Sequence, residues 1–245
     1  MVIAGWNEKY ATIRKEFKYS EEQDRESAII LDSILRKNIS NKKIRDEISG
    51  KTVFVIGAGP SLSLAIPKLK KFKKVVKIVA DSAVKPLIEN GIKPNIVVTD
   101  LDGDEHSLKK VGKTDSIFVV HAHGDNISKL QLAENFKNCI GTTQTNPFKK
   151  IQNFGGFTDG DRSVFLANYF EAKKIILFGM DFGKKIGKYS QTKASERQIK
   201  LRKLRRAKLL LEWLSENSRS QLFTTSSQIN GFEKISYNEL DIIIT

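Results

Sequence analysis

Residues 96–104 read Ile-Val-Val-Thr-Asp-Leu-Asp-Gly-Asp, an apolar run followed at once by three carboxylates. The β-branched start of this stretch predicts a short buried strand. Asp100, Asp102 and Asp104 are spaced by two, and Gly103 lets the backbone turn among them. Such acids repel one another unless a cation or hydrogen-bond donors lie between them. Mg²⁺ suits the position because it prefers hard oxygen ligands and shares its shell with substrate phosphates. A solvated acidic turn is the alternative.

Further apolar runs end in polar or Gly-rich turns and alternate with helical patterns. Together with the run at 96–98, they lie at 53–56, 75–80, 116–120, 139–144 and 175–178. This alternation predicts an α/β fold with right-handed crossovers and a mostly parallel six-stranded sheet covered by helices on both faces. Ligand sites in such folds lie outside the carboxyl ends of the strands.

The composition narrows the class of protein. The 245 residues include 42 Lys and Arg against 28 Asp and Glu, a formal net charge of +14, which predicts attraction to anions such as nucleotides or nucleic acid. A single cysteine, Cys139, excludes an intramolecular disulfide and a Cys-based zinc site. No apolar stretch approaches ~20 residues and no signal-peptide pattern opens the chain, so we expect a cytoplasmic protein with no membrane partner.

Two organisational units are expected, residues 1–50 as a helical segment packed on the core and residues 51–245 as the α/β domain. Ser20 matches the start of a capping box for one helix, and 39–48 predicts a second, more polar one. The acidic side chains of this segment carry no evident chemistry and are expected to be solvated. They are Glu21, Glu22, Asp24, Glu26 and Asp32.

Residues 197–215 predict a long amphipathic helix with a strongly basic first half. A solvated basic face is the simpler interpretation, and nucleic-acid binding is the functional alternative. Nucleic acid is disfavoured as a partner because no aromatic interleaving or nucleic-acid motif accompanies the charge. The tail from Leu222, including 242–244, predicts one or two edge strands.

The first strand runs into a Gly-rich turn at 57–61, where small residues let backbone N–H groups approach a phosphate at a helix N-terminus. Leu62 takes the place of the third glycine of a dinucleotide fingerprint, so a tight turn without ligand is the alternative. Asp81 ends the second strand. It could hold a ribose, ligate a metal or cap a helix.

His121 and His123 end the fourth strand, and their alternate spacing puts both on one side of an extended segment. Zinc is a poor interpretation because His106 is the only other histidine and no third nitrogen or sulfur ligand is evident. We interpret the pair as donors to a phosphate or a base, with Asp125 or Asn126 capping the next helix. Two packed histidines are the alternative.

Residues 158–162, Thr-Asp-Gly-Asp-Arg, are a second acidic stretch of sequence, directly before a helical pattern. A helix cap needs one acid, so the surplus indicates a site, in which Arg162 could hold a phosphate bidentately. The fifth strand ends in hydroxyl and amide groups at 142–144. The loop 184–195 is rich in Lys, Gly and Ser and predicts a mobile lid over a triphosphate, or a plain surface loop.

Six motifs, in this order, resemble the archaeal (MptE-like) 6-hydroxymethyl-7,8-dihydropterin diphosphokinases, which are related in fold to the thiamine diphosphokinase catalytic domain. The motifs are Gly-Ala-Gly-Pro-Ser-Leu at 57–62, Thr-Asp-Leu-Asp-Gly at 99–103, His-Ala-His-Gly-Asp-Asn at 121–126, Gly-Thr-Thr-Gln at 141–144, Gly-Phe-Thr-Asp-Gly-Asp-Arg at 156–162 and Gly-Met-Asp-Phe-Gly at 179–183. The resemblance covers about 52–190. It implies ATP- and Mg²⁺-dependent transfer of a diphosphoryl group to the pterin hydroxymethyl oxygen, with release of AMP.

Roles for individual residues are hypotheses from residue type and position. The metal ligands would be Asp100, Asp102 and Asp81. The catalytic group would comprise Asp100, Asp102, Asp159, Asp161 and Arg162. Nucleotide contacts would come from Gly57, Gly59, Pro60, Ser61, His121, His123, Asn126 and Lys188. Substrate contacts would come from Asp81, Thr142, Thr143, Gln144 and Thr158.

Other functions compete with this one. A thiamine-type diphosphokinase and a sugar-nucleotide-dependent glycosyltransferase-like enzyme fit the same domain, since no stretch spells out a pterin pocket. An NAD(P)- or FAD-binding oxidoreductase fits the Gly-rich turn but leaves the acidic clusters unexplained. A nucleic-acid-binding domain rests on charge alone. The expected partners are ATP and a small alcohol, and the sequence is compatible with a homo-oligomer.

Overall fold

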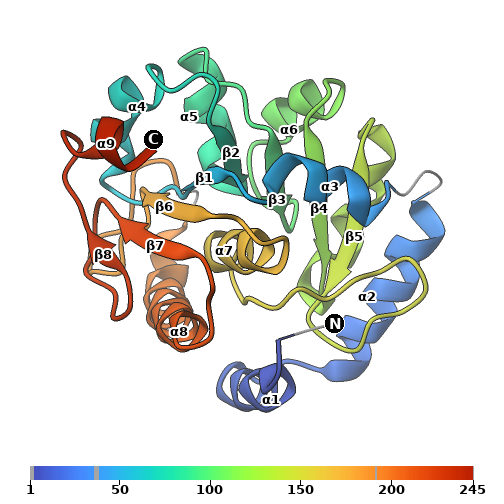
Figure 1. Ribbon diagram of the computed structural model, residues 1–245. Helices are drawn as coiled ribbons and strands as arrows, with labels where there is room; N and C mark the ends of the chain where they lie inside the picture. Colours follow the sequence, from blue (N-terminus) through green and yellow to red (C-terminus); the bar gives the residue numbers. More distant parts are fainter. Residues whose placement is uncertain (1–2, 36–38, 191, 245) are drawn as a thin grey trace.

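The computed structural model describes residues 3–35, 39–190 and 192–244 (Figure 1). One sheet has the strand order β5-β4-β3-β2-β1-β6-β7-β8, and every pair of neighbouring strands is parallel. The strands are β1 (Thr52–Ile56), β2 (Val76–Ala80), β3 (Ile96–Thr99), β4 (Ile117–Ala122), β5 (Cys139–Thr143), β6 (Lys174–Phe178), β7 (Gln221–Thr224) and β8 (Glu233–Lys234).

The α/β class and the parallel sheet are confirmed, but the sheet has eight strands rather than six. The two additional strands come from the tail, where β7 and β8 continue the same parallel sheet beyond β6. The strand predicted at 242–244 is wrong, because these residues belong to helix α9 (Leu240–Ile244). Leu240 is buried in the core while Ile242 is largely exposed, so a single helical turn packs on the sheet by one side.

The remaining α-helices are α1 (Trp6–Phe17), α2 (Glu21–Ile34), α3 (Asn41–Ile48), α4 (Leu62–Leu69), α5 (Val84–Glu89), α6 (Glu105–Gly112), α7 (Asp159–Tyr169) and α8 (Arg197–Ser215). Short 3₁₀ segments are η1 (Asp81–Ala83), η2 (Gly124–Asn135) and η3 (Ala194–Glu196). Within the described ranges no helix is long and apolar enough to cross a membrane.

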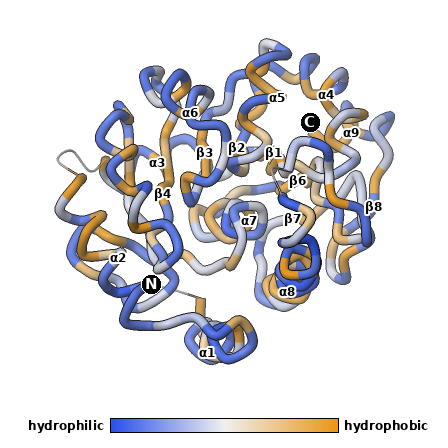
Figure 2. The backbone as a smooth tube through the Cα atoms, turned by 180° about the vertical axis from the view of Figure 1, so that it is seen from behind, coloured by the Kyte–Doolittle hydropathy of each residue, from blue (hydrophilic) through white to orange (hydrophobic). Residues whose placement is uncertain are grey.

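The two faces of the sheet are covered by different helices because strand side chains alternate in direction. Val53 and Val55 pack in a cluster with residues of α1, α3, α7 and α8. Phe54 and Ile56 pack in a second cluster with residues of α2, α4, α5 and α6. In Figure 2 most of the sheet is coloured as hydrophobic, whereas α8 carries both kinds of residue. This two-sided burial explains why the strands read as continuous apolar runs.

The strand order reverses at β1, because the chain adds β2 to β5 on one side of it and β6 to β8 on the other. All the strands are parallel, so the loops that follow them meet at one edge of the sheet. Asp81, Asp100 and His123 follow three adjacent strands at that edge, β2, β3 and β4. Polar residues far apart in the sequence are thereby collected in one place.

Helix α2 of the N-terminal segment packs beside β4, β5 and η2, away from α9 and β8 (Figure 1). Ser20 caps α2 as predicted, with its hydroxyl accepting from the backbone N–H of Gln23 at 3.3 Å. Helix α1 lies in the segment predicted to be helical, although the sequence pattern did not indicate it as a separate helix. The prediction that Asp24 and Asp32 are solvated is wrong, since they are only 2% and 7% exposed. Both carboxylates lie on the inner side of α2 and accept hydrogen bonds from later parts of the chain.

Candidate active site

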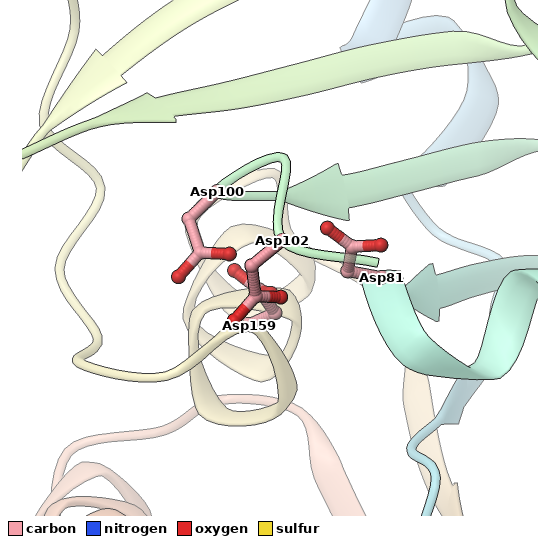
Figure 3. Close-up of side chains that lie close together, drawn as sticks. All are labelled: Asp81, Asp100, Asp102 and Asp159. Carbon is pink, nitrogen blue, oxygen red and sulfur yellow. The ribbon is translucent and has the colours of Figure 1, made fainter. Parts of the chain in front are cut away.

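Four carboxylates converge at the carboxyl edge of the sheet (Figure 3). Asp81 begins η1 after β2, Asp100 and Asp102 lie in the loop after β3, and Asp159 begins α7. One oxygen from each lies within 4.8 Å of the others. Oxygens on opposite sides of one octahedral Mg²⁺ are separated by about 4.2 Å, so the group is close to the size of a single ion's shell. We refer to these residues as the acidic cluster.

The loop after β3 makes a tight turn at Leu101, with Asp100 and Asp102 on either side of it. Leu101 has a left-handed backbone with φ of 68°, a conformation that costs a non-glycine residue roughly 1–2 kcal/mol. Its buried side chain anchors the turn, and its N–H donates to the hydroxyl of Thr99 at 2.7 Å. The same hydroxyl donates to Asp81. Thr99 therefore joins the end of β3 to the carboxylate that follows β2.

Gly103 is required by close approach rather than by backbone conformation. A methyl group at this position would lie 1.7 Å from Oδ1 of Asp81 and 2.7 Å from its carboxyl carbon. Any side chain would push the Asp81 carboxylate out of its position. The loop after β3 and the start of η1 are thus in direct contact at the acidic cluster.

The electrostatics of the acidic cluster favour a bound cation. Oδ1 of Asp81 and Oδ1 of Asp100 are buried without a hydrogen-bond partner among the described residues. Burial and the charges of Asp100 and Asp102 raise the pKa of Asp81 to about 7. Lost hydration and the charge of Asp100 raise the pKa of Asp102 to about 6. These groups resist ionising together, and a divalent ion would remove that resistance.

Asp100 is the member that stays ionised. Burial opposes its charge, but the hydrogen bond and charge of His123, together with the charge of Arg162, outweigh burial and hold the pKa of Asp100 below its usual value. The His123 Nε2 atom lies 3.5 Å from Oδ2 of Asp100. Burial and the negative charge of Asp100 hold the pKa of Asp159 well above its usual value, although the Arg162 guanidinium acts in the opposite direction.

Asp104 separates from the other two acids of its loop. Its Oδ1 atom accepts from the backbone N–H and the hydroxyl of Ser107 at 3.0 and 2.6 Å, which caps α6. Its Oδ2 atom lies 3.2 Å from Nζ of Lys85. Asp104 is therefore occupied as a helix cap and lies outside the acidic cluster.

Asp159 and Asp161 separate in a similar way. Asp161 accepts from the backbone N–H groups of Phe157 and Thr158 at 2.6 and 2.8 Å, and from the Thr158 hydroxyl at 2.5 Å. It thus caps α7 from within, while Asp159 faces the acidic cluster. Arg162, one turn later, donates to Asp159 Oδ1 at 3.2 Å.

The histidines differ in their surroundings. His121 is buried, and burial with the Arg162 charge holds the pKa of its ring well below its usual value. Its Nδ1 atom lies 3.2 Å from the hydroxyl of Thr142, which itself donates to the carbonyl of Val120. Neutral His121 therefore carries its proton on Nδ1 and leaves Nε2 as an acceptor. That Nε2 has no hydrogen-bond partner among the described residues.

His121 and Arg162 both line a small cavity between β4, β5 and α7. Its volume is about 10 Å³, close to the space of one water molecule and too small for a substrate ring. The Nε atom of Arg162 is buried without a partner among the described residues.

The side chains predicted to contact substrate or nucleotide are largely engaged with the protein itself. Asn126 donates to the carbonyls of Asp100 and His121 at 2.8 and 2.7 Å, so it ties the ends of β3 and β4 together. The hydroxyl of Thr143 pairs with that of Thr145 at 3.2 Å. Thr142 and Thr158 are engaged as described above, and Gln144 is hydrogen-bonded on both its amide atoms.

The Gly-rich turn after β1 is also engaged internally. The N–H of Gly59 donates to the carbonyl of Gly179, and the N–H and hydroxyl of Ser61 donate to Oδ2 of Asp181 at 2.9 and 2.8 Å. These groups join the loops after β1 and β6 at the point where the strand order reverses. Asp181 was not among the predicted site residues, although its place after the sixth apolar run is a signal of the same kind as at Asp81 and Asp100.

The lysine-rich loop reaches this turn. Gly187 approaches Ala58 so closely that a methyl group on it would lie 2.0 Å from the Ala58 carbonyl oxygen. Lys188 is exposed, with its ammonium 4.9 Å from the centre of the Tyr189 ring.

Helix α8 brings positive charge to the acidic cluster. Nζ of Lys203 lies 5.6 Å from the ring centre of Tyr19 and 6.0 Å from that of Phe157, two residues before Asp159. Burial opposes its charge, but Tyr19 and acids including Asp100 outweigh burial and raise the pKa of Lys203. The interpretation of this helix as carrying a solvated basic face therefore needs correcting for Lys203.

Comparison with known proteins connects this chain to one family. A family model described as "6-hydroxymethylpterin diphosphokinase MptE-like" matches residues 31–187. A Pyrococcus furiosus protein named 6-hydroxymethyl-7,8-dihydropterin pyrophosphokinase is 43% identical over 90% of this chain and 97% of its own length. Proteins of the same name from Methanocaldococcus jannaschii and Methanothermobacter thermautotrophicus are 43% and 36% identical, over 88% and 89% of this chain and 97% of theirs.

A solved structure shares the fold. The Maf glycosyltransferase from Magnetospirillum magneticum AMB-1 matches with a TM-score of 0.57 at 17% identity. The match covers 78% of this chain and 34% of that one. At this level of identity the likeness concerns the fold alone.

The contact between Gly103 and Asp81 predicts the effect of a single methyl group. Gly103→Ala is expected to weaken binding of Mn²⁺ by roughly tenfold or more, because the Asp81 carboxylate has to leave the acidic cluster. Isothermal titration calorimetry measures this. Gly183→Ala is the matched control, since no atom lies within 4 Å of the added methyl group. Equal affinities of the two variants would contradict the placement of Asp81.

The raised pKa values predict how cation binding depends on pH. A cation requires the deprotonated carboxylates, whereas the ion-free protein holds protons on Asp81 below pH about 7 and on Asp102 below pH about 6. Affinity for Mn²⁺ is therefore expected to fall as the pH is lowered, by about twentyfold between pH 8 and pH 6. Titration calorimetry in buffers of different ionisation enthalpy should show protons released on binding. An affinity that stays constant over this range would contradict the assignment.

Proposed function

Because the chain belongs to the MptE-like 6-hydroxymethylpterin diphosphokinase family and is a transferase, we propose that it transfers the diphosphoryl group of ATP to 6-hydroxymethyl-7,8-dihydropterin. The acceptor atom would be the hydroxymethyl oxygen, and AMP would be released. The observation that carries the proposal is the acidic cluster, with two buried oxygens that lack a partner among the described residues. Such a cluster suits the divalent ion that accompanies a nucleotide polyphosphate.

Asp81, Asp100 and Asp102 would hold Mg²⁺. When bound, the ion would offset the negative charge of the polyphosphate that the acceptor oxygen has to approach. Asp102 is the exposed member of the acidic cluster, so the ion and the nucleotide would enter from its side. Asp100, whose pKa is held low by His123 and Arg162, would give the ion its first anchor.

Asp159 is suited to accept the proton that the acceptor hydroxyl releases. In the proposed reaction the hydroxymethyl oxygen bonds to the β-phosphorus, and the bond from that phosphorus to the oxygen it shares with the α-phosphate breaks. The hydroxyl proton has to leave as the new bond forms, and AMP departs with the bridging oxygen. A carboxylate whose pKa is raised well above its usual value accepts such a proton more readily near neutral pH.

Positive groups around the acidic cluster would stabilise the phosphoryl charge. The Arg162 guanidinium is only 7% exposed and is fixed by Asp159 on one side and Gln144 on the other, so its direction is set before substrate binds. Lys203 of α8 lies over Phe157 beside the acidic cluster. Lys188 is exposed on the loop that contacts the Gly-rich turn, where it could approach a triphosphate.

The Gly-rich turn would bind nucleotide by its shape rather than through the amides of Gly59 and Ser61. Those groups already donate to Gly179 and Asp181. A nucleotide would therefore contact the turn, as predicted, through the surface that the turn presents between β1 and β6.

The reaction has a direct test. Purified protein incubated with ATP, Mg²⁺ and 6-hydroxymethyl-7,8-dihydropterin is expected to form the pterin diphosphate and AMP in equal amounts, as measured by anion-exchange chromatography. Parallel reactions contain thiamine or a sugar nucleotide, the alternatives left open by the sequence. Formation of ADP, or turnover of thiamine in preference to the pterin, would contradict the proposal.

Asp102 and Asp104 offer a matched pair of substitutions on one loop. Asp102→Asn is expected to lower kcat by on the order of a hundredfold or more, because a neutral amide is a poor ligand for Mg²⁺. Asp104→Asn is expected to keep near-normal kcat, since asparagine also caps helices well. Both variants should remain folded by circular dichroism. A near-normal kcat for Asp102→Asn at saturating Mg²⁺ would show that the metal lies elsewhere.

A further inference from the structure

Asp24 on α2 is a buried acid that connects separate parts of the chain. It is 2% exposed. Its Oδ1 atom accepts from the backbone N–H of Gly124, at the start of η2, at 2.9 Å. Its Oδ2 atom accepts from Nε2 of Gln144, after β5, at 3.1 Å, and from the hydroxyl of Tyr10 on α1. One carboxylate thus holds α1, η2 and the segment after β5 together.

The hydrogen bonds continue from Gln144 to the acidic cluster. The Oε1 atom of Gln144 accepts from one terminal nitrogen of Arg162 at 3.4 Å. The other terminal nitrogen of Arg162 donates to Asp159 at 3.2 Å. Asp24, Gln144 and Arg162 are each less than 10% exposed, so water does not compete for these bonds. The result is a continuous path from the N-terminal segment to a member of the acidic cluster.

The path has a fixed direction because its ends are chemically different. An ionised carboxylate only accepts hydrogen bonds, and a guanidinium only donates them. The amide of Gln144 therefore has to present its nitrogen to Asp24 and its oxygen to Arg162. Trp6 fixes the backbone of the same residue by donating from its indole nitrogen to the Gln144 carbonyl at 3.1 Å.

We propose that Asp24 is a positioning residue for the diphosphoryl-transfer site. Through Gln144 it sets the direction of the Arg162 guanidinium against Asp159, and through Gly124 it holds the loop that carries His123. The family model begins at residue 31, so Tyr10 and Asp24 lie outside the region that it matches. The N-terminal segment thereby contributes to the site without touching the reacting groups. The effect on turnover rests on the proposed function.

Asp24→Asn tests the direction of the path while nearly preserving volume. If the introduced amide turns its oxygen toward Gly124, it presents an NH₂ group to the NH₂ group of Gln144. Gln144 then has to flip, which turns its NH₂ group toward Arg162. In the other orientation the introduced amide faces the Gly124 N–H with a second donor. One connection is lost in either case, and kcat is expected to fall roughly tenfold, with a smaller change in KM for ATP.

Gln144→Glu in the same protein provides the rescue. A glutamate in place of Gln144 accepts both from the introduced amide and from Arg162, so the double variant restores every donor–acceptor pair of the path. Gln144→Glu alone places two carboxylates together and is expected to be damaging. The double variant should therefore recover most of the lost kcat and melt at a higher temperature than either single variant.

Asp32→Asn is the control for a buried acid on the same helix. Asp32 accepts from the backbone N–H of Lys150 at 3.2 Å, away from the acidic cluster. This variant is expected to lower the melting temperature but to keep kcat within about twofold of the unmodified protein.

Affinity for inorganic pyrophosphate with Mg²⁺, measured by calorimetry, gives a readout that does not require turnover. It should weaken in Asp24→Asn and recover in the double variant, because Arg162 loses and regains its direction. If the unmodified protein makes no pterin diphosphate, the proposed function fails while this readout still tests the path. Normal kcat and normal pyrophosphate affinity in Asp24→Asn, or no recovery in the double variant, would overturn the positioning role.

Discussion

The mutual repulsion of four carboxylates is the constraint around which this edge of the sheet is organised. Asp81 follows β2, Asp100 and Asp102 follow β3, and Asp159 begins α7, yet their oxygens lie within 4.8 Å of one another. Charges of one sign at that spacing are costly in a partly buried position. The raised pKa values of Asp81 and Asp102 express this cost. The free energy of folding offsets the cost of bringing the four carboxylates together, and a bound cation would remove that cost.

Neutral and positive neighbours give the four carboxylates different pKa values. His123 and Arg162 keep Asp100 ionised, whereas burial and the charge of Asp100 raise the pKa of Asp159. Thr99 and Gly103 hold Asp81 by contact rather than by charge. Acids of one type therefore differ in pKa because their surroundings differ. This division is what a site needs in order to bind an ion with some groups and accept a proton with another.

The segments at the two ends of the chain complete the site. Helix α2 packs beside β4 and β5 and is connected to the acidic cluster through Asp24, Gln144 and Arg162. Helix α8 pairs with α1 through Arg206 and Glu16 and places Lys203 over Phe157. Part of the positive charge in the composition is thus placed beside the acidic cluster, where an anionic substrate would need it.

The sequence by itself determined the α/β class and the first six strands, and it marked Asp81, Asp100, Asp102 and Asp159 as acids at the ends of apolar runs or before a helix, because these are local patterns. Their convergence depended on the strand order and on where α7 packs. Only the tertiary structure separated Asp104 and Asp161, which cap helices, from the acids beside them, and showed Asp24 to be buried. It also placed β7 and β8 in the main sheet. Each of these outcomes depends on which distant atom a side chain meets, such as Gly124 and Gln144 for Asp24, and local sequence carries no record of that partner.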